Sequence, residues 1–252
     1  MKVEGRVYTD TSKLSVRPIS KSVAKDIIVA NHYSHAWTKV SYSFGLYVED
    51  NSHQFFESTD KLIGVACYGD PIGRLTGQSI SEIIKRDEVL ELVRLFVFDD
   101  YGHNIESWFL GQTFEWLRKN SPKIKALISY SDPKEGHAGT IYQATNWIYQ
   151  GNKLRYNDSW GFKFEEDGEW MHGRTIFPQY GTTEPAKIQE LVDKPFWIRK
   201  EPRKHRYVYV LSKGGVRRKI LKNLKHPSFP YPKGGDTEEM EIHKLDPIER
   251  SK

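Results

Sequence analysis

Four polar side chains in succession follow an apolar run near the middle of the chain: Ser129, Tyr130, Ser131 and Asp132. Polar side chains directly after a buried strand add nothing to packing, so they indicate a site at the strand end. In open α/β sheets, ligands bind at such ends. Asp132 has the chemistry of a general base or of a hard metal ligand. It is equally suited to capping the turn that follows, and the residues alone leave both readings open.

A second candidate group follows within fifteen residues. Tyr142 and Asn146 are four residues apart, which places them on one face of a short helix predicted at residues 139–146. Trp147 begins the next segment. A tyrosine hydroxyl beside a strand end can donate a proton to a leaving group. The alternative is a core tyrosine whose hydroxyl has a structural partner.

Arg94 lies inside the most apolar run, residues 89–98. A buried guanidinium is costly unless it is paired, and Glu91 points to the other face of an ideal strand. We therefore expect Arg94 either to reach an acid elsewhere in the core or to bind an anionic group of a ligand.

The loop at residues 99–107 opens a long helix, with Asn104 as a suitable cap and Ser107 three residues later. Helix N-termini bind phosphates through free N–H groups and the helix dipole. Asn104 and Ser107 are therefore candidate cofactor ligands. The loop also has a single glycine and two acids before the helix, which favours a plain cap at Asn104.

His32 and Tyr33 form a polar and aromatic group with His35 and Trp37 at the end of the first predicted helix. With Asp132 they could form a metal site, although no two histidines have the spacing of a zinc site. An aromatic patch that stacks on bases is the alternative.

Hydrophobic periodicity and turn residues predict the elements that must position these residues. The predicted order requires an α/β (α+β) fold with a mixed central sheet and helices on both faces. The predicted strands are residues 14–19, 41–48, 61–69, 89–98, 124–130, 148–156, 170–177 and 207–211, and the predicted helices are residues 23–30, 79–85, 104–119, 139–146 and 183–192, with residues 217–224 either strand or helix.

The composition, 38% hydrophobic and 28% charged over 252 residues, is that of a globular protein with a sizeable core. No apolar run is long enough to span a bilayer, and the first residues do not resemble a signal peptide. Cys67 is the single cysteine, which excludes an internal disulfide. We expect a cytoplasmic protein with no membrane partner.

The net charge of +5 is unevenly distributed. Residues 199–225 hold eleven Lys or Arg and one acid, and residues 236–252 hold six acids and three bases. A basic segment on a nearly neutral body suits a polyanion, and a solvated basic face is the alternative. We expect a globular domain (1–195), a basic extension (196–235) and an acidic flexible tail (236–252). The expected phosphate contacts are Arg199, Lys200, Arg203, Lys204, Arg206, Arg217, Arg218 and Lys219.

These residues carry a resemblance to known families. The order of elements resembles the GNAT acyltransferase fold. Five separated blocks, at residues 91–95, 104–107, 129–132, 136–139 and 141–151, resemble the Mom family of phage DNA-modification proteins. The similarity covers roughly residues 14–180.

The resemblance implies an enzyme that converts the N6 amine of adenine in double-stranded DNA to an acetamido (carbamoylmethyl) derivative and so protects phage DNA from host restriction. It implies functional roles for Arg94, Ser107, Asp132 and Tyr142, acetyl-CoA or another acyl donor, and a bound iron. The adenine must leave the base stack to react. The expected substrate contacts are His32, Tyr33, Tyr130, Asn146 and Trp147.

Several alternatives stay open. One is a GNAT-type acyltransferase that acts on tRNA or protein, and another is a nucleic-acid-binding protein without catalysis. The loop at residues 99–107 lacks the glycine pattern that cradles the CoA diphosphate, so the donor is open. The sequence also leaves the oligomeric state open, with a homodimer among the options.

Overall fold

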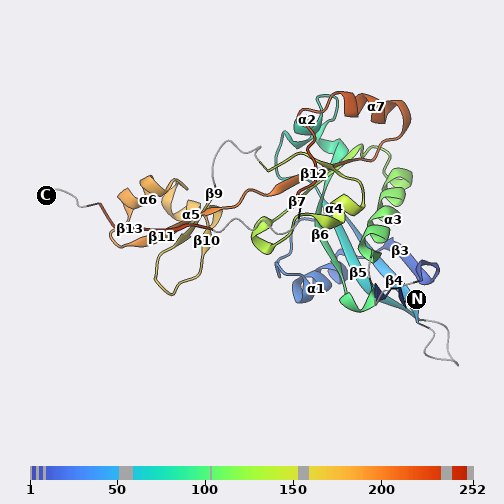
Figure 1. Cartoon of the computed structure of the whole chain (residues 1–252), viewed down its shortest axis with the longest axis horizontal. Helices are drawn as coiled ribbons and strands as arrows, with labels where there is room; N and C mark the ends of the chain where they lie inside the picture. The colour runs from blue at the N-terminus through green and yellow to red at the C-terminus, as the bar shows by residue number, and fades with distance from the viewer. Residues whose placement is uncertain are drawn as a thin grey trace. The chain divides into compact units, whose positions relative to one another are not determined.

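The computed structural model describes residues 2–3, 6–7, 10–50, 59–102, 104–152, 159–233 and 240–248. The chain forms two compact units (Figure 1), each built from separated stretches of sequence. The larger unit comprises residues 1–130, 139–150 and 206–231, and the smaller comprises residues 131–138, 151–205 and 232–252.

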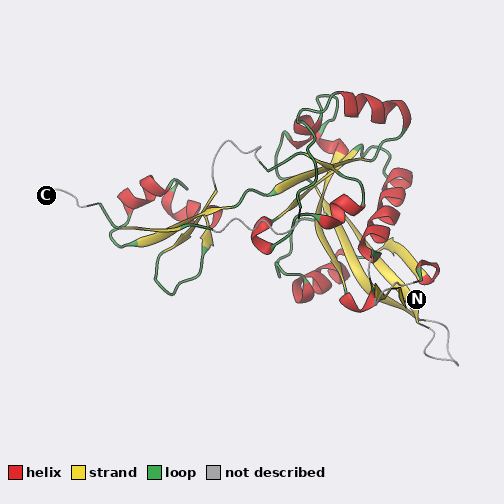
Figure 2. Cartoon of the chain, in the orientation of Figure 1, coloured by secondary structure: helices red, strands yellow, loops and turns green. Residues whose placement is uncertain are grey.

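A seven-stranded mixed sheet forms the centre of the larger unit (Figure 2). Its order is β3-β4-β5-β6-β7-β12-β8, in which β3 to β6 are antiparallel neighbours and β6 and β7 are parallel. The strands are β3 (Leu14–Pro18), β4 (Tyr42–Asp50), β5 (Thr59–Gly69), β6 (Val89–Val97), β7 (Ala126–Ser131), β12 (His205–Val210) and β8 (Ile148–Tyr149).

Successive side chains of a strand point to opposite faces, and β5 shows both. Val65 and Cys67 pack with α1 (Lys21–Asn31), whereas Ala66 and Tyr68 pack with the apolar side of α3 (Ile105–Asn120). The predicted mixed sheet with helices on both faces is therefore confirmed.

A local sequence signal explains where α1 begins. The Ser20 hydroxyl accepts from the Val23 amide and caps α1, which buries Ala24 and Ile28. Short helices complete the larger unit: α2 (Thr76–Ile80), α4 (Thr140–Ala144) and α7 (Gly214–Lys222), with 3-10 turns at Thr11–Lys13, Arg86–Glu88 and Asp99–Tyr101 and a small sheet of β1 (Lys2–Val3) and β2 (Arg6–Val7). No helix within the described ranges has the length and hydropathy needed to cross a membrane.

The smaller unit has its own sheet and core. Its four antiparallel strands lie in the order β10-β9-β11-β13, with bounds β10 (Met171–His172), β9 (Ser159–Lys163), β11 (Phe196–Glu201) and β13 (Ile242–Leu245). Phe162, Phe196 and Ile198 pack with Ile176 of α5 (Gly173–Tyr180) and Ile188 of α6 (Pro185–Leu191). A 3-10 turn, Pro133–Glu135, also belongs to this unit.

The structure differs from the predicted outline in two places. Residues 170–177 are not one strand, because the chain turns after β10 and forms α5, capped by the His172 side chain. The basic segment at residues 196–235 is not a separate extension. It contributes β11 to the smaller unit's sheet, then β12 and α7 to the larger unit.

Candidate active site

The parallel strands β6 and β7 pair over a short stretch only. Residues 89–91 pair with residues 126–128, and beyond them no further β6–β7 pairing exists among the described residues of the two strands. Where the ladder stops, the carbonyl oxygen of Leu92 accepts a hydrogen bond from Ser129 Oγ at 2.9 Å. The Ser129 hydroxyl thus takes the place of a backbone partner for Leu92, and a polar side chain lies at the centre of the sheet.

Tyr142 of α4 reaches the same point. Its hydroxyl oxygen lies 2.8 Å from Ser129 Oγ. Ser129 Oγ has one proton, so at a given moment it donates either to the Tyr142 hydroxyl or to the Leu92 carbonyl. The Tyr142 ring is held by Trp147 and Tyr207, with centroids 5.2 and 4.9 Å away. Tyr142 is therefore positioned at the end of the β6–β7 pairing.

Burial raises the pKa of Tyr142 to about 12, although the hydrogen bond with Ser129 acts in the opposite direction. The phenol is therefore protonated at neutral pH, which is the state that a proton donor requires. The sequence singled out Tyr142 but treated Ser129 only as part of a polar run. The missing signal was the end of the strand pairing, which is a tertiary feature.

Replacing Ser129 with alanine leaves the buried Leu92 carbonyl without this partner, and we expect the free energy of unfolding to fall by about 1–3 kcal/mol. It should also raise the pKa of Tyr142 further, because the lost hydrogen bond lowers it. Denaturant unfolding and a pH titration of ¹³Cζ-labelled tyrosine measure the two effects.

The matched control is Ser131→Ala, two residues further in β7. The Ser131 hydroxyl is buried and has no hydrogen-bond partner in the described structure, so its removal should cost little. Equal losses in the two variants would contradict the role given to Ser129.

Trp147 is fully buried, packs against Phe114 and Tyr209 as well as Tyr142, and has an indole N–H without a partner among the described groups. It supports Tyr142 from the core. Asn146, predicted to share a helix face with Tyr142, lies beyond the end of α4 with φ 59° and is exposed. The prediction was wrong because α4 ends at Ala144 and an asparagine tolerates the left-handed conformation.

Arg94 lies where β5 and β6 lose their regular register, opposite Cys67 on the α1 side of the sheet. Its guanidinium donates to two backbone carbonyls, Ala36 at 3.1 Å and Val93 at 2.6 Å. No carboxylate in the described ranges pairs with it. Backbone carbonyls are therefore the partners of this guanidinium among the described residues, an arrangement that neither expectation named.

Asn104 is the N-cap residue of α3 with φ 65°, but its side chain makes no capping hydrogen bond. Ser107 Oγ donates back to the Asn104 carbonyl at 2.8 Å, and Glu106 adds negative charge to the first turn. A diphosphate needs free donors and no adjacent carboxylate. The residues at this helix start therefore do not fit the cradle of a CoA diphosphate.

The proposed metal ligands are already engaged. His32 is buried, and its Nδ1 accepts from the Ser34 amide at 3.1 Å. The Tyr33 ring stacks on the imidazole with centroids 4.2 Å apart and is 57% exposed. The part of the chain that the structure describes contains no group of three His, Cys, Asp or Glu suited to a metal. These residues do not fit an iron site.

Asp132 belongs to the smaller unit and directly follows β7 in the chain. Its carboxylate caps the Pro133–Glu135 turn by accepting from the Lys134 amide at 3.2 Å. It also forms an ion pair with Lys204 at 2.8 Å. The capping alternative considered for Asp132 is therefore present in the structure.

Two of the expected phosphate contacts, Arg199 and Arg206, are buried. Arg199 is buried, pairs with Glu201 at 3.1 Å and lies over Trp170. Arg206 is 8% exposed and donates to Gln150 and Ser79 at 2.9 Å each, and Tyr130, 39% exposed, also bonds it. Alternate residues of a strand must face inward, which explains Arg206 beside Val208. Lys200, Lys204, Arg218 and Lys219 are exposed, and Arg203 is half-buried.

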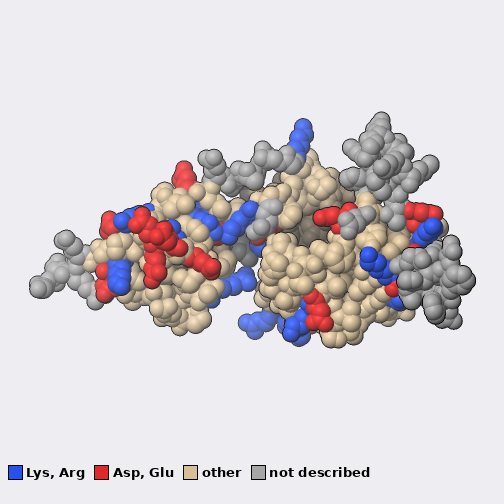
Figure 3. All heavy atoms as spheres, turned by 90° about the horizontal axis from the view of Figure 1, so that it is seen from below, with Lys and Arg blue, Asp and Glu red and all other residues tan. Residues whose placement is uncertain are grey.

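One segment of the larger unit contains basic residues and no acidic ones. Residues 206–231 hold seven Lys or Arg and no acid. The face in Figure 3 shows acidic side chains mixed with basic ones over the smaller unit and mostly uncharged surface over the larger. On α7, the three cations Arg218, Lys219 and Lys222 are exposed.

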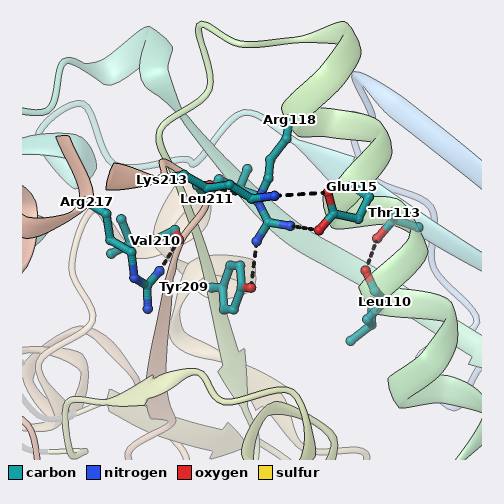
Figure 4. Close-up of polar contacts among 9 residues, drawn as sticks. All are labelled: Leu110, Thr113, Glu115, Arg118, Tyr209, Val210, Leu211, Lys213 and Arg217. Carbon is teal, nitrogen blue, oxygen red and sulfur yellow. Dashed lines mark hydrogen bonds and ion pairs between the residues drawn. The ribbon is translucent and has the colours of Figure 1, made fainter. Parts of the chain in front are cut away.

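The region around the start of α7 is anchored to α3 through Arg118 (Figure 4). Arg118 donates to the Tyr209 hydroxyl at 2.8 Å, to the Leu211 carbonyl at 2.9 Å and to Glu115 at 2.6 Å. Glu115 also pairs with Lys213 at 3.5 Å. Arg217 donates to the Val210 carbonyl at 2.6 Å. These contacts fix α7 and leave its other cations free for a partner.

A sequence profile of the Mom protein family matches residues 13–233. The methylcarbamoylase Mom of Escherichia phage Mu is 28% identical over 236 residues, 91% of this chain and 88% of the relative. Two similar solved structures, each covering at least 80% of this chain, are the ribosomal-protein-S5-alanine acetyltransferase of Vibrio fischeri (13% identity, 82% of this chain and 98% of that one, TM-score 0.43) and the spermidine N-acetyltransferase of Vibrio cholerae (9%, 80% and 96%, 0.42). Because both TM-scores are below 0.5, no functional argument is drawn from these two structures.

Proposed function

The chain belongs to the Mom protein family and is a transferase, and from this premise we propose that it modifies DNA. The proposed reaction converts the N6 amine of adenine in double-stranded DNA to an acetamido (carbamoylmethyl) derivative. The proposed consequence is protection of phage DNA from host restriction. The phage Mu relative, named a methylcarbamoylase, supports this class of reaction.

The observation that carries the proposal is Tyr142, protonated and fixed at the end of the β6–β7 pairing. In the proposed step the adenine nitrogen forms a bond to the methylene carbon of a donor that carries an activated carbamoylmethyl group. The bond from that carbon to its leaving group breaks. The amine loses one proton, and Tyr142 gives one to the leaving group, so that the net proton transfer is from amine to leaving group.

The other roles follow from the resemblance and stay proposals. Arg94, which no described carboxylate neutralises, would contact negative charge on the donor or on the developing transition state. For Asp132 we propose the role of base. In this role the Asp132 carboxylate must leave its ion pair with Lys204. Ser107, at the start of α3, would stabilise developing charge as the alternative to Arg94.

The nucleic-acid contacts of the proposal rest on charge. The exposed cations of α7 would bind the phosphates of the duplex. An adenine amine within the duplex is reachable only after the base leaves the stack. His32, Tyr33 and Tyr130 are the proposed contacts for the extruded base, and Trp147 supports Tyr142 from the core.

The test is expression of the chain in bacteria, followed by digestion of their DNA to nucleosides and mass spectrometry. We expect a modified deoxyadenosine whose added mass equals that of the carbamoylmethyl group, and plasmid from these cells should resist restriction enzymes with adenine in their sites. Unmodified DNA in cells that contain folded protein would overturn the proposal. An adduct in their tRNA would then support the tRNA alternative.

A further inference from the structure

One face of the smaller unit's sheet is covered and the other carries tryptophans. The covered face holds Phe162, Phe196 and Ile198, which pack with α5 and α6. Because side chains alternate along a strand, Trp197 and Arg199 of β11 point to the opposite face. The two tryptophans in question, Trp170 and Trp197, are not part of the smaller unit's apolar core and are half-buried.

Cations flank both indoles. In the sheet register, Trp197 lies between Lys163 of β9 and Lys244 of β13. Their ammonium groups are 5.1 and 5.4 Å from the centroid of the Trp197 ring. Lys163 is also 5.6 Å from the ring of Trp170, and the Arg199 guanidinium is 4.3 Å from it. Two indoles and three cations thus alternate on one surface, which we call the indole face.

The charge of the indole face favours phosphates, but only a few of them. Its one strand carboxylate, Glu201, is occupied by Arg199 at 3.1 Å and Lys134 at 3.6 Å. Lys244 is exposed, whereas Lys163 is half-buried and its ammonium group donates to the Glu166 carbonyl. The adjoining turn contains the exposed acids Glu165, Glu166, Asp167 and Glu169. A duplex, with one charge per about 1.7 Å of axis, would meet these acids, whereas a short unpaired strand stacks bases on aromatic rings and needs few cations.

We propose that the indole face binds unpaired nucleotides of a DNA strand, with bases stacked on Trp197 and Trp170 and phosphates contacted by Lys163 and Lys244. This inference rests on the proposed function, in which an extruded adenine creates unpaired nucleotides. It assigns the smaller unit a role in holding the strand, separate from the duplex contacts of α7.

The test measures binding of the full chain to a fluorescent single-stranded deoxyoligonucleotide and to its duplex by anisotropy. Trp197→Ala and Trp170→Ala should each weaken single-strand binding between about fivefold and a hundredfold, the range for a lost base stack. Duplex affinity should change less than twofold. Trp197→Phe keeps an aromatic ring and should retain most of the single-strand affinity. This variant is the control for loss of affinity through misfolding.

Lysine variants test the phosphate contacts. Lys163→Ala and Lys244→Ala should each reduce the slope of log affinity against log salt for the single strand by about 0.7. The matched control is Lys187→Ala, an exposed lysine of α6 on the covered side, which should leave the slope unchanged. Wild-type binding in both tryptophan variants, or an equal loss in the control, overturns the proposal.

The two proposals fail separately. Binding of unmodified oligonucleotides requires no transfer chemistry, so single-strand binding that depends on Trp197 stands even if no deoxyadenosine adduct is found. An adduct formed by a protein whose tryptophan variants bind normally would reject the indole face and keep the proposed function.

Discussion

Tyr142→Phe is expected to slow DNA modification by about 10²- to 10⁴-fold, the contribution of a positioned proton donor. The phenyl ring keeps its contacts with Trp147 and Tyr207, and Ser129 keeps the Leu92 carbonyl as a partner. The fold should therefore persist, with a melting temperature close to that of the parent. The rate is measured as deoxyadenosine adduct formed per unit of protein over time.

The control for Tyr142→Phe is Tyr149→Phe. Tyr149 is also a buried tyrosine beside Tyr207, with centroids 5.1 Å apart, but it lies on β8, which is not a neighbour of β6 in the sheet. The control should retain most of the adduct formation. Activity of Tyr142→Phe within threefold of the parent would exclude Tyr142 as the proton donor.

Replacement of Arg218, Lys219 and Lys222 by alanine is expected to weaken duplex binding by about a hundredfold or more at 0.1 M salt. If each contacts one phosphate, the slope of log affinity against log salt should fall by about 0.9 per residue. The three side chains are exposed on α7, and the segment around them contains no acid to offset the loss. Anisotropy titrations of a labelled duplex over a range of salt concentrations measure both quantities.

Lys21 and Lys25 of α1 provide the comparison for α7, since both are exposed lysines on a helix of the same unit. Their replacement by alanine should change the slope little. A similar decrease in both sets would mean that binding follows net charge alone and not a surface centred on α7.

Apolar runs predicted the part of the fold that they bury. β6 and β7 were expected from apolar runs, and α3 from apolar and aromatic residues spaced along a helix; each forms close to its predicted range. β11 was not expected, because its charged residues Arg199, Lys200 and Glu201 interrupt the alternation of apolar and polar side chains that is typical of a strand. The predicted helix at residues 79–85 ends at Ile80, where the chain turns toward Arg86–Glu88.

The candidate site was predictable in type more than in geometry. Tyr142 and Arg94 stood out because a polar side chain in an apolar setting needs a reason. The hydrogen bond from Ser129 to Leu92 forms at the place where two strands stop pairing, which the sequence does not reveal. The ion pair of Asp132 joins it to Lys204, 72 positions later in the chain. The basic segment suggested one DNA-binding arm, but counting charges does not reveal that Arg199 and Arg206 face inward.

The order in which the strands leave the ribosome bears on how the smaller unit folds. Its sheet is completed by β13, which is synthesised after β12 and α7 of the larger unit. During translation the larger sheet can therefore close while β11 still has one open edge, which exposes unpaired backbone groups to other chains. The open edge of β11 is therefore closed only when the last strand of the chain, β13, has been made and pairs with it.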